Sequence, residues 1–202
     1  GALLRAGEIF AAKRRDLLLP RDVDETILFA ILSIHEPKTR HSGPRHQAAK
    51  LDTPDLLQVV DLAFGGKSEG TRLWEKSGQT LRMRFKELLR ELRLPLEKFN
   101  GMKPLDLGSL RAGGATWHLQ VTENSEYCRR KGRWINMKTM EIYVQETTSI
   151  LYLKRIPSEA RTKVLTVANL FPKILQRSIA LQQANVPKNV WYALHNQEDL
   201  WR

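Results

Sequence analysis

Apolar residues recur at helical spacing through most of this chain, and this periodicity constrains its fold more than any other feature. The clearest case is residues 80–92, where Leu81, Phe85, Leu88 and Leu92 share one side and basic residues mostly occupy the other. That segment predicts an amphipathic helix with a basic side. Comparable spacing predicts further helices over 2–13, 53–64, 109–119, 122–130, 136–145 and 164–179.

Residues 26–34 interrupt this pattern with an apolar, partly β-branched run. The turn-forming His41-Ser42-Gly43-Pro44 follows, and residues 46–51 can return as a partner strand. Together they predict a β-hairpin with a basic tip. The expected fold class is therefore α+β and mainly α, with a small antiparallel β-sheet made of this hairpin and at most one edge strand.

The size of the chain favours one compact domain. Its 202 residues, 42% of them hydrophobic, can bury one sizeable core. We expect a domain over residues 1–152 and a helical C-terminal extension over 153–202. The chain opens at Gly1 without a methionine, and its first residues resemble the middle of a helix. We therefore expect it to be cut from a longer protein.

The charge balance indicates a polyanionic partner. The chain has 33 Lys and Arg against 22 Asp and Glu, a net charge of +11, and its pI is near 10.0. Binding a polyanion releases counterions, so nucleic acid is the first partner to expect. A membrane surface is the competing partner, but no apolar run reaches the roughly 18 residues needed to span a bilayer.

Several cofactor classes are disfavoured. Cys128 is the only cysteine, which excludes an internal disulfide and a cysteine-based zinc cluster, fits a reducing compartment, and favours a buried apolar role. His35, His41 and His46 lack the carboxylates and cysteines that would complete a metal site. The Gly65-Gly66-Lys67-Ser68 segment lacks the spacing of a phosphate-binding P-loop. We therefore expect no metal, nucleotide or other cofactor.

A basic chain without metal can still cut a phosphodiester. The reaction needs a nucleophile, cations that offset charge on the phosphate oxygens, and an acid for the leaving hydroxyl. A tyrosine can supply the nucleophile. Arginines can supply the cations, because the guanidinium fork binds phosphate in a bidentate manner and stays charged.

Four local motifs, in order, resemble the catalytic domain of the tyrosine recombinases, the phage integrase family. Leu3-Leu4-Arg5-Ala6-Gly7-Glu8 resembles the segment that carries the family's first catalytic arginine. Ser109-Leu110-Arg111-Ala112-Gly113-Gly114-Ala115-Thr116 resembles the segment with the second. Gly132-Arg133-Trp134 is the third motif, with Trp134 23 residues after Arg111, where the family has His or Trp. The fourth is Met140-Glu141-Ile142-Tyr143, in which Tyr143, nine residues after Trp134, lies at the nucleophile's position.

The resemblance implies a role for each residue. Arg5 and Arg111 would bind the scissile phosphate, and Tyr143 would attack it to leave a 3′-phosphotyrosyl link and a free 5′-hydroxyl. Trp134 would contact the phosphate through its indole N–H. The family also has a lysine on a β-hairpin as acid for the leaving oxygen, and we favour Lys38 over Lys50.

The resemblance also implies partners. Double-stranded DNA would be the substrate, bound by a homo-tetramer, and the segment after Tyr143 would dock onto a neighbour. The chain would work inside the cell, with DNA in a nucleus or nucleoid, and neither a membrane nor a nucleotide is expected as partner. Further DNA contacts are expected from basic residues near the motifs and the hairpin. These are Arg14, Arg15, Arg40, Arg45 and Arg133.

Two positions depart from the family pattern. Gly108 stands three residues before Arg111, where the family commonly has His, and Ala112 stands where many members have a second basic residue. Gly108 removes a proton-transfer group, a role worth roughly 10²–10⁴-fold in rate. His118 or His46 are the candidates to replace it. Glu8 is expected to support the setting of Arg5.

The leading hypothesis is a site-specific recombinase or integrase of a mobile element. The alternative is an inactive DNA-binding remnant, motivated by Gly108. A third hypothesis is a type IB topoisomerase, because that class uses a similar set of residues. A fourth is a helical interaction module without a DNA role.

Overall fold

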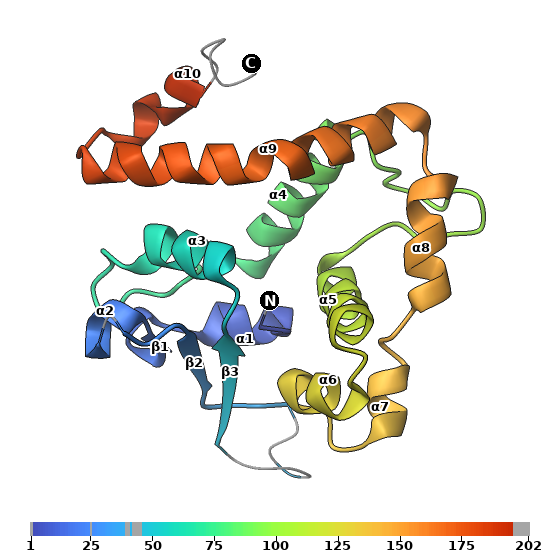
Figure 1. The fold of residues 1–202 in the computed structure, drawn as a ribbon, viewed down its shortest axis with the longest axis horizontal. Coiled ribbons are helices and arrows are strands. Elements are labelled where there is room, and N and C mark those ends of the chain that lie inside the picture. Colours follow the sequence, from blue (N-terminus) through green and yellow to red (C-terminus); the bar gives the residue numbers. More distant parts are fainter. Residues whose placement is uncertain (1, 25, 39–40, 42–45, 196–202) are drawn as a thin grey trace.

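A computed structural model of the chain describes residues 2–24, 26–38, 41 and 46–195 (Figure 1). It is mainly helical with a small antiparallel sheet, as the sequence predicts. The sheet and the first helices lie on one side of the molecule, and a group of short helices lies on the other. The long helix α9 (Ser158–Gln183) runs across both (Figure 1).

The sheet is three-stranded, in the order β1-β2-β3. Its strands are β1 (Leu17–Leu18), β2 (Ala30–Ile34) and β3 (Gln47–Leu51). The predicted hairpin is confirmed, although the first strand begins at Ala30 rather than at residue 26. Its tip, residues 39–40 and 42–45, lies outside the described residues. The short edge strand β1 pairs Leu17 with Leu32.

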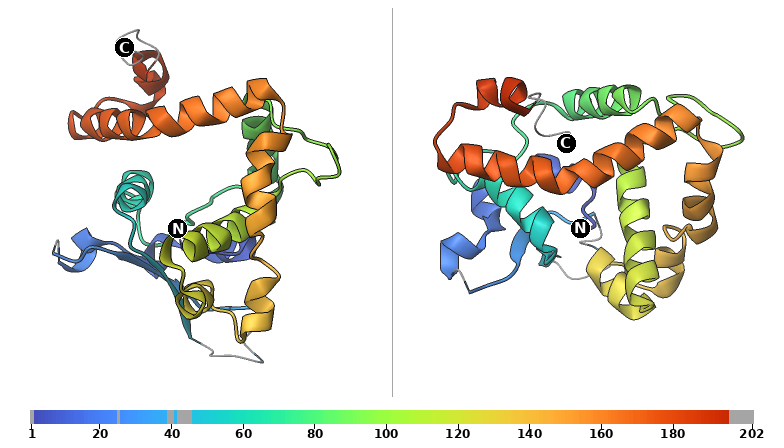
Figure 2. Two further views of the ribbon diagram at one scale, coloured as in Figure 1. Left: turned by 45° about the vertical axis from the view of Figure 1, so that its right-hand side comes forward. Right: turned by 45° about the horizontal axis from the view of Figure 1, so that its top comes forward.

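One face of this sheet forms the first apolar cluster. Alternate residues along β2 and β3 point to that face, as strand geometry requires, and are buried. Side chains of α3 (Pro54–Phe64) pack against the same cluster. The cluster consists of Ala12, Leu17, Leu19, Ala30, Leu32, Ile34, Ala49 and Leu51. Figure 2 shows α3 between the sheet and α9, and contacts join α3 to α9.

The N-terminal segments surround this sheet. The helix predicted over 2–13 is shorter, α1 (Ala6–Ala11), and is followed by the 3-10 helix η1 (Arg14–Asp16) and by α2 (Pro20–Val23). α1 lies close to the short helices of the other side (Figure 1). This placement brings Arg5, the residue before α1, to the boundary between the two sides.

The second apolar cluster holds the short helices together. It joins Leu3 to side chains of α5 (Leu107–Thr122), α6 (Ser125–Gly132) and α7 (Met137–Glu141). Each of these helices begins at a side-chain cap, from Asp106, Asn124 and Asn136 respectively, which satisfies backbone N–H groups of the first turn. The buried members are Leu3, Ala115, Cys128, Trp134 and Met140, so the apolar role expected for Cys128 is confirmed.

A third apolar cluster connects α4 (Gly78–Glu91) to α8 (Glu146–Arg155) and α9. Leu89 of α4 and Leu94 pack there with Ile156 and Ala160. The boundary expected between residues 152 and 153 therefore falls inside α8, and residues on both sides of it contribute to one cluster. The chain ends, in its described part, with η2 (Lys188–Val190) and α10 (Trp191–His195).

Candidate active site

Arg111 lies at the centre of the candidate site. It belongs to the second turn of α5 and is only 4% exposed. Its Nη1 donates to the backbone carbonyl of Leu3, and its Nη2 donates to the carbonyl of Gly132. These two bonds tie α5 to the segment before α1 and to the end of α6. The first and third recombinase-like motifs therefore meet at the arginine of the second.

Glu8 joins two further arginines to this point. Its Oε1 accepts from Nη1 of Arg5 at 3.1 Å, and its Oε2 accepts from Nη2 of Arg133 at 2.6 Å. The backbone N–H of Arg5 also donates to Oε2, at 2.8 Å. The Glu8 side chain is 5% exposed, so this carboxylate is a buried bridge. The sequence-based role for Glu8, support of Arg5, was thus incomplete, since Glu8 also holds Arg133.

The cluster of Arg5, Arg111, Arg133 and Glu8, hereafter the arginine cluster, carries more positive than negative charge. Three guanidinium groups face one carboxylate. Burial, followed by repulsion from Arg5 and Arg133, lowers the pKa of Arg111 to about 10. Burial likewise lowers the pKa of Arg133. Such a cluster is stabilised by an added anion, because an opposite charge offsets both repulsion and desolvation.

Several N–H groups of this cluster have no hydrogen-bond acceptor. Among the described residues, no partner is found for Nε of Arg111 or for Nε and Nη1 of Arg133. Unsatisfied buried donors are costly, and they are often explained by a ligand that occupies the site in use. Guanidinium N–H groups match the oxygens of phosphate in geometry and in charge.

Trp134 and Tyr143 lie against the same arginine. Their ring centres are 5.1 Å apart, and Cζ of Arg111 lies 4.8 Å from the centre of the Trp134 ring and 5.6 Å from that of Tyr143. Trp134 is 3% exposed, and its Nε1 has no partner among the described residues. The structure thus brings together Arg5, Arg111, Trp134 and Tyr143, four of the five predicted catalytic residues.

Tyr143 does not lie on a helix, contrary to the predicted helix over 136–145. The helix α7 ends at Glu141, and Tyr143 follows in a turn. The backbone N–H of Tyr143 donates to the Met140 carbonyl at 2.8 Å. Its side chain is partly buried. A position just beyond a helix end leaves the phenol at the edge of the apolar cluster, beside Arg111.

Lys38, the fifth predicted residue, shares a cavity with Arg5. The cavity has a volume of about 630 Å³. Its charged and polar lining includes Arg5, Glu8, Arg15, Asp16, His35 and Lys38. Lys50, the less favoured candidate, points elsewhere: its Nζ lies 4.5 Å from the centre of the Phe29 ring and 3.8 Å from Asp52. Of the two hairpin lysines, Lys38 is thus the one that lines a cavity with Arg5, and Lys13 lines the same cavity from the end of α1.

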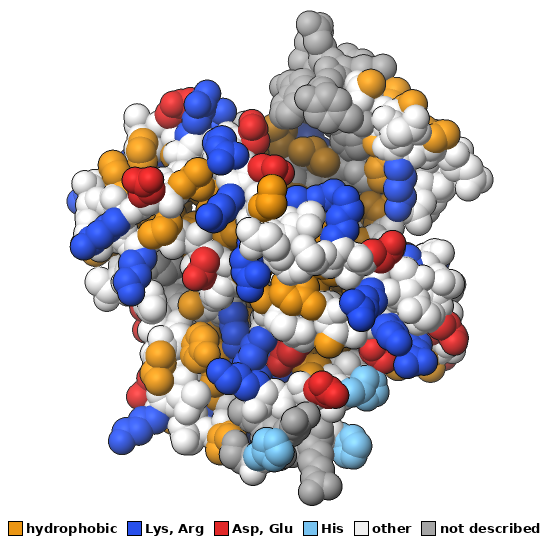
Figure 3. Space-filling view, turned by 180° about the vertical axis from the view of Figure 1, so that it is seen from behind, with side chains coloured by type: hydrophobic (Ala, Val, Ile, Leu, Met, Phe, Trp, Pro, Cys, Tyr) orange, Lys and Arg blue, Asp and Glu red, His pale blue; other side chains and the backbone are white. Residues whose placement is uncertain are grey.

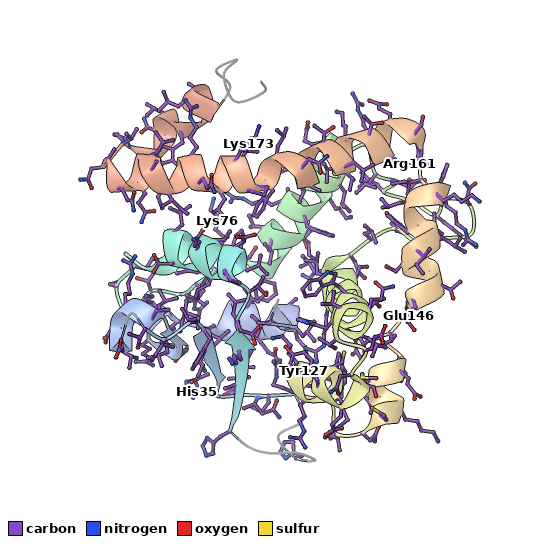
Figure 4. All side chains as sticks on the ribbon, viewed as in Figure 1. His35, Lys76, Tyr127, Glu146, Arg161 and Lys173 are labelled. Atoms are coloured by element: carbon purple, nitrogen blue, oxygen red, sulfur yellow. The ribbon has the colours of Figure 1, made fainter. Side chains whose placement is uncertain are left out.

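The same cavity contains a pair that the sequence did not single out. Nε2 of His35, just after β2, lies 3.0 Å from Oδ1 of Asp16. Figure 4 labels His35 beyond the end of this strand. In sequence the two residues are 19 positions apart, so only the pairing of β1 with β2 brings them together. A histidine held by a carboxylate can accept and pass protons.

The residues predicted to bind DNA separate into three groups. Arg14 is buried: it donates to the Leu17 carbonyl at 2.6 Å and to Asp22 at 2.7 Å, so it stabilises the N-terminal segments and is not presented to a ligand. Arg15 is exposed at the Lys38 cavity, and Arg133 belongs to the arginine cluster. Arg40 and Arg45 lie outside the described residues.

The departures from the family pattern lie at the start of α5. Gly108 is exposed in its first turn, and Ala112 is partly buried. His118 does not replace the missing histidine: it is 4% exposed and packs against the rings of Trp117 and Tyr127, two helical turns beyond Arg111. His46 is exposed just before β3.

Comparison of the chain with protein-family models, with curated proteins and with solved structures gave no match. Within residues 2–24, 26–38, 41 and 46–195, no group of three or more metal-ligating side chains is suited to hold an ion. In the same part of the chain, every helix is too short or too polar to cross a membrane.

Proposed function

We propose that this chain cuts and rejoins DNA strands through a 3′-phosphotyrosyl intermediate on Tyr143, as a site-specific recombinase or integrase. The observation that carries the proposal is the convergence of a cationic cluster, a tryptophan and a tyrosine from three distant segments. The tyrosine ring lies against Arg111, whose charge no carboxylate neutralises directly within the described residues.

The chemistry follows from these positions. Arg5 and Arg111 bind the non-bridging oxygens of the scissile phosphate and offset the charge that develops there. The Tyr143 oxygen forms a bond to phosphorus as the bond from phosphorus to the 5′-oxygen breaks. The phenol proton leaves to solvent, and Lys38 gives a proton to the departing 5′-oxygen. Rejoining reverses these steps, so no metal, nucleotide or redox partner enters the balance.

A second feature supports DNA as the substrate. Figure 3 shows a run of Lys and Arg side chains down the middle of the face opposite to that of Figure 1. On α4, Arg82, Lys86 and Arg90 are exposed and recur every fourth residue, so they form one row along the helix. The net charge of +11 acts in the same direction.

Covalent trapping on a nicked suicide substrate tests this function. The chain would be fused to a heterologous DNA-binding domain, so that binding is assured, and compared with its Tyr143→Phe variant. We expect a denaturant-resistant protein–DNA adduct from the parent and none from the variant. If the parent binds this DNA and forms no adduct, strand cleavage by this chain is ruled out.

One observation favours a second candidate, a DNA-binding remnant without turnover. Gly108 is exposed where the family that the motifs resemble commonly has a catalytic histidine, and His118 is packed elsewhere. The remnant would bind DNA through the same cations in a salt-dependent manner. Neither the parent chain nor its Tyr143→Phe variant would then form an adduct.

A further inference from the structure

We propose that Arg133 is a third ligand of the scissile phosphate, which Glu8 holds in place until the phosphate enters. This inference rests on the proposed function and adds a phosphate ligand to it. It concerns a position that the motif comparison assigned only to general DNA contact. In the structure, Arg133 lies within the arginine cluster and not on an outer surface.

The backbone places this side chain inward. Arg133 follows the last residue of α6 and has a left-handed conformation, φ 58°. Such a conformation is uncommon for residues other than glycine and asparagine, and it costs about 1–2 kcal/mol relative to the right-handed one. The strain turns the side chain back toward α1, where it reaches Glu8. The adjacent Trp134 is thereby placed against Arg111.

A comparison with Arg14 indicates that the hydrogen bonds of Arg133 within the chain leave more of its donors unused than those of a purely structural arginine. Both side chains are 8% exposed and each has a carboxylate partner. Arg14 donates from Nη1 and twice from Nη2, so both terminal nitrogens are used, and of its nitrogens only Nε lacks a partner among the described residues. The difference between the two arginines therefore lies at Nη1. Arg133 donates from Nη2 alone, and its Nε and Nη1 are buried without a partner among the described residues.

The vacant groups suit a phosphate oxygen. Burial disfavours the charge on Arg133 and nearby Arg5 repels it, while Glu8 is already shared with Arg5. A phosphodiester would offer the acceptors and the negative charge that the cluster lacks. Gly108 can offer neither a proton nor a phosphate contact, and a third cation would replace the contact. Arg133 supplies no proton, because a guanidinium stays charged.

Titration with inorganic phosphate tests this inference without catalysis. The Nε–Hε resonances of Arg5, Arg111 and Arg133 would be followed by NMR, with Arg14 as the buried control outside the cluster. We expect the three cluster arginines to shift along one saturation curve and Arg14 to stay unmoved. Shifts of Arg5 and Arg111 without Arg133 would overturn the inference and leave the proposed function intact. If none of the three shifts, the phosphate site itself is refuted.

Adduct formation by Arg133→Gly gives a second readout. Glycine suits the φ of 58°, so this variant relieves backbone strain and should fold. We expect its adduct to form about 10²–10³-fold more slowly on a phosphodiester, the typical cost of losing one donor to the developing charge. On a neutral methylphosphonate linkage the deficit should be much smaller. An equal deficit on both linkages would mean a structural role and would overturn the inference.

Discussion

In the reaction that we propose, proton transfer to the leaving oxygen depends on one residue, and the chain offers a matched pair of lysines to examine it. Lys38 shares the cavity of Arg5, whereas Lys50 lies over Phe29 and near Asp52. Both are exposed and neither is part of an apolar cluster. Replacing either one should therefore leave the fold intact.

We expect Lys38→Ala to slow strand cleavage by about 10²–10⁴-fold, because the 5′-oxygen would leave without its acid. A 5′-bridging phosphorothiolate should restore the rate, since a thiolate leaves without protonation. Gel assays of adduct formation on both substrates measure this. Lys50→Ala serves as the control and should behave as the parent. A defect confined to Lys50→Ala would contradict the assignment.

The buried charge of Arg111 should make the stability of the fold depend on pH and on bound anions. Burial and the neighbouring arginines lower the pKa of Arg111 to about 10 in the folded chain, so between that pH and the ordinary pKa of arginine the unfolded state keeps a proton that the folded state has lost. The contribution of Arg111 to stability therefore rises with pH across that window, and at neutral pH its buried charge is destabilising. A bound anion should remove this penalty at neutral pH.

Phosphate should accordingly raise the melting temperature more than chloride at equal ionic strength. At ten times its dissociation constant, a ligand that binds only the folded state adds about 1.4 kcal/mol of stability. Thermal unfolding followed by circular dichroism measures the increment, which we expect to shrink in Arg5→Gln. An equal increment in both proteins would show that phosphate acts away from the arginine cluster.

At the scale of elements, the end of α6 is packed more tightly than its sequence indicates. A Cβ built at Gly132 would overlap the ring of Trp134, and the carbonyl of the same residue accepts from Arg111. Gly113, in the middle of α5, has open space where its Cβ would lie. A side chain is therefore excluded at Gly132 and can be accommodated at Gly113.

Gly132→Ala should destabilise the chain by about 1–3 kcal/mol, the usual cost of overpacking, and should impair cleavage by moving Trp134. Gly113→Ala should stabilise it by about 0.5–1 kcal/mol, because alanine loses less backbone entropy in a helix. Urea unfolding of both variants checks the signs. A stable Gly132→Ala variant with full activity would show that Trp134 is not held by this contact.

Much of the element order follows from local pattern, but the contacts of the site do not. Apolar spacing over 80–92 predicted α4 nearly to its ends, and the β-branched run predicted the hairpin. The α8 helix was not predicted. Its apolar residues Ile150 and Leu153 are exposed, so they make no buried stripe of the kind that the periodicity detects.

In the candidate site, too, the sequence predicted the residues but not their contacts. Motif order was enough to select Arg5, Arg111, Trp134 and Tyr143, which the structure places together. The burial of Arg14 depends on Asp22, and the place of Arg133 depends on Glu8, 125 positions away. Arg111 is held by backbone carbonyls, which any residue carries. No residue pattern encodes such partners, so these roles required the fold.

At the scale of the whole molecule, the basic row of α4 adds exposed positive charge outside the arginine cluster. Lys86 belongs to this row, whereas Lys173 lies on α9 and points away from the rest of the molecule (Figure 4). Both lysines are exposed, so their replacement tests position rather than net charge.

Lys86→Ala should weaken DNA binding and reduce the slope of log K against log salt by about 0.9, the value for one lost phosphate contact. Lys173→Ala lowers the net charge equally and should leave the slope unchanged. Fluorescence anisotropy across a salt series measures both. Equal slopes for the two variants would mean that α4 does not contact the DNA backbone.

The most direct measurement is to identify the tyrosine that carries DNA in a trapped adduct. Proteolysis of the adduct and mass spectrometry of the nucleotide-bearing peptide would distinguish Tyr143 from Tyr127 and Tyr152, which lie outside the arginine cluster. We expect the nucleotide on Tyr143, linked through a 3′-phosphate. A nucleotide on another tyrosine, or a peptide without one from DNA-bound protein, would contradict catalysis at this site.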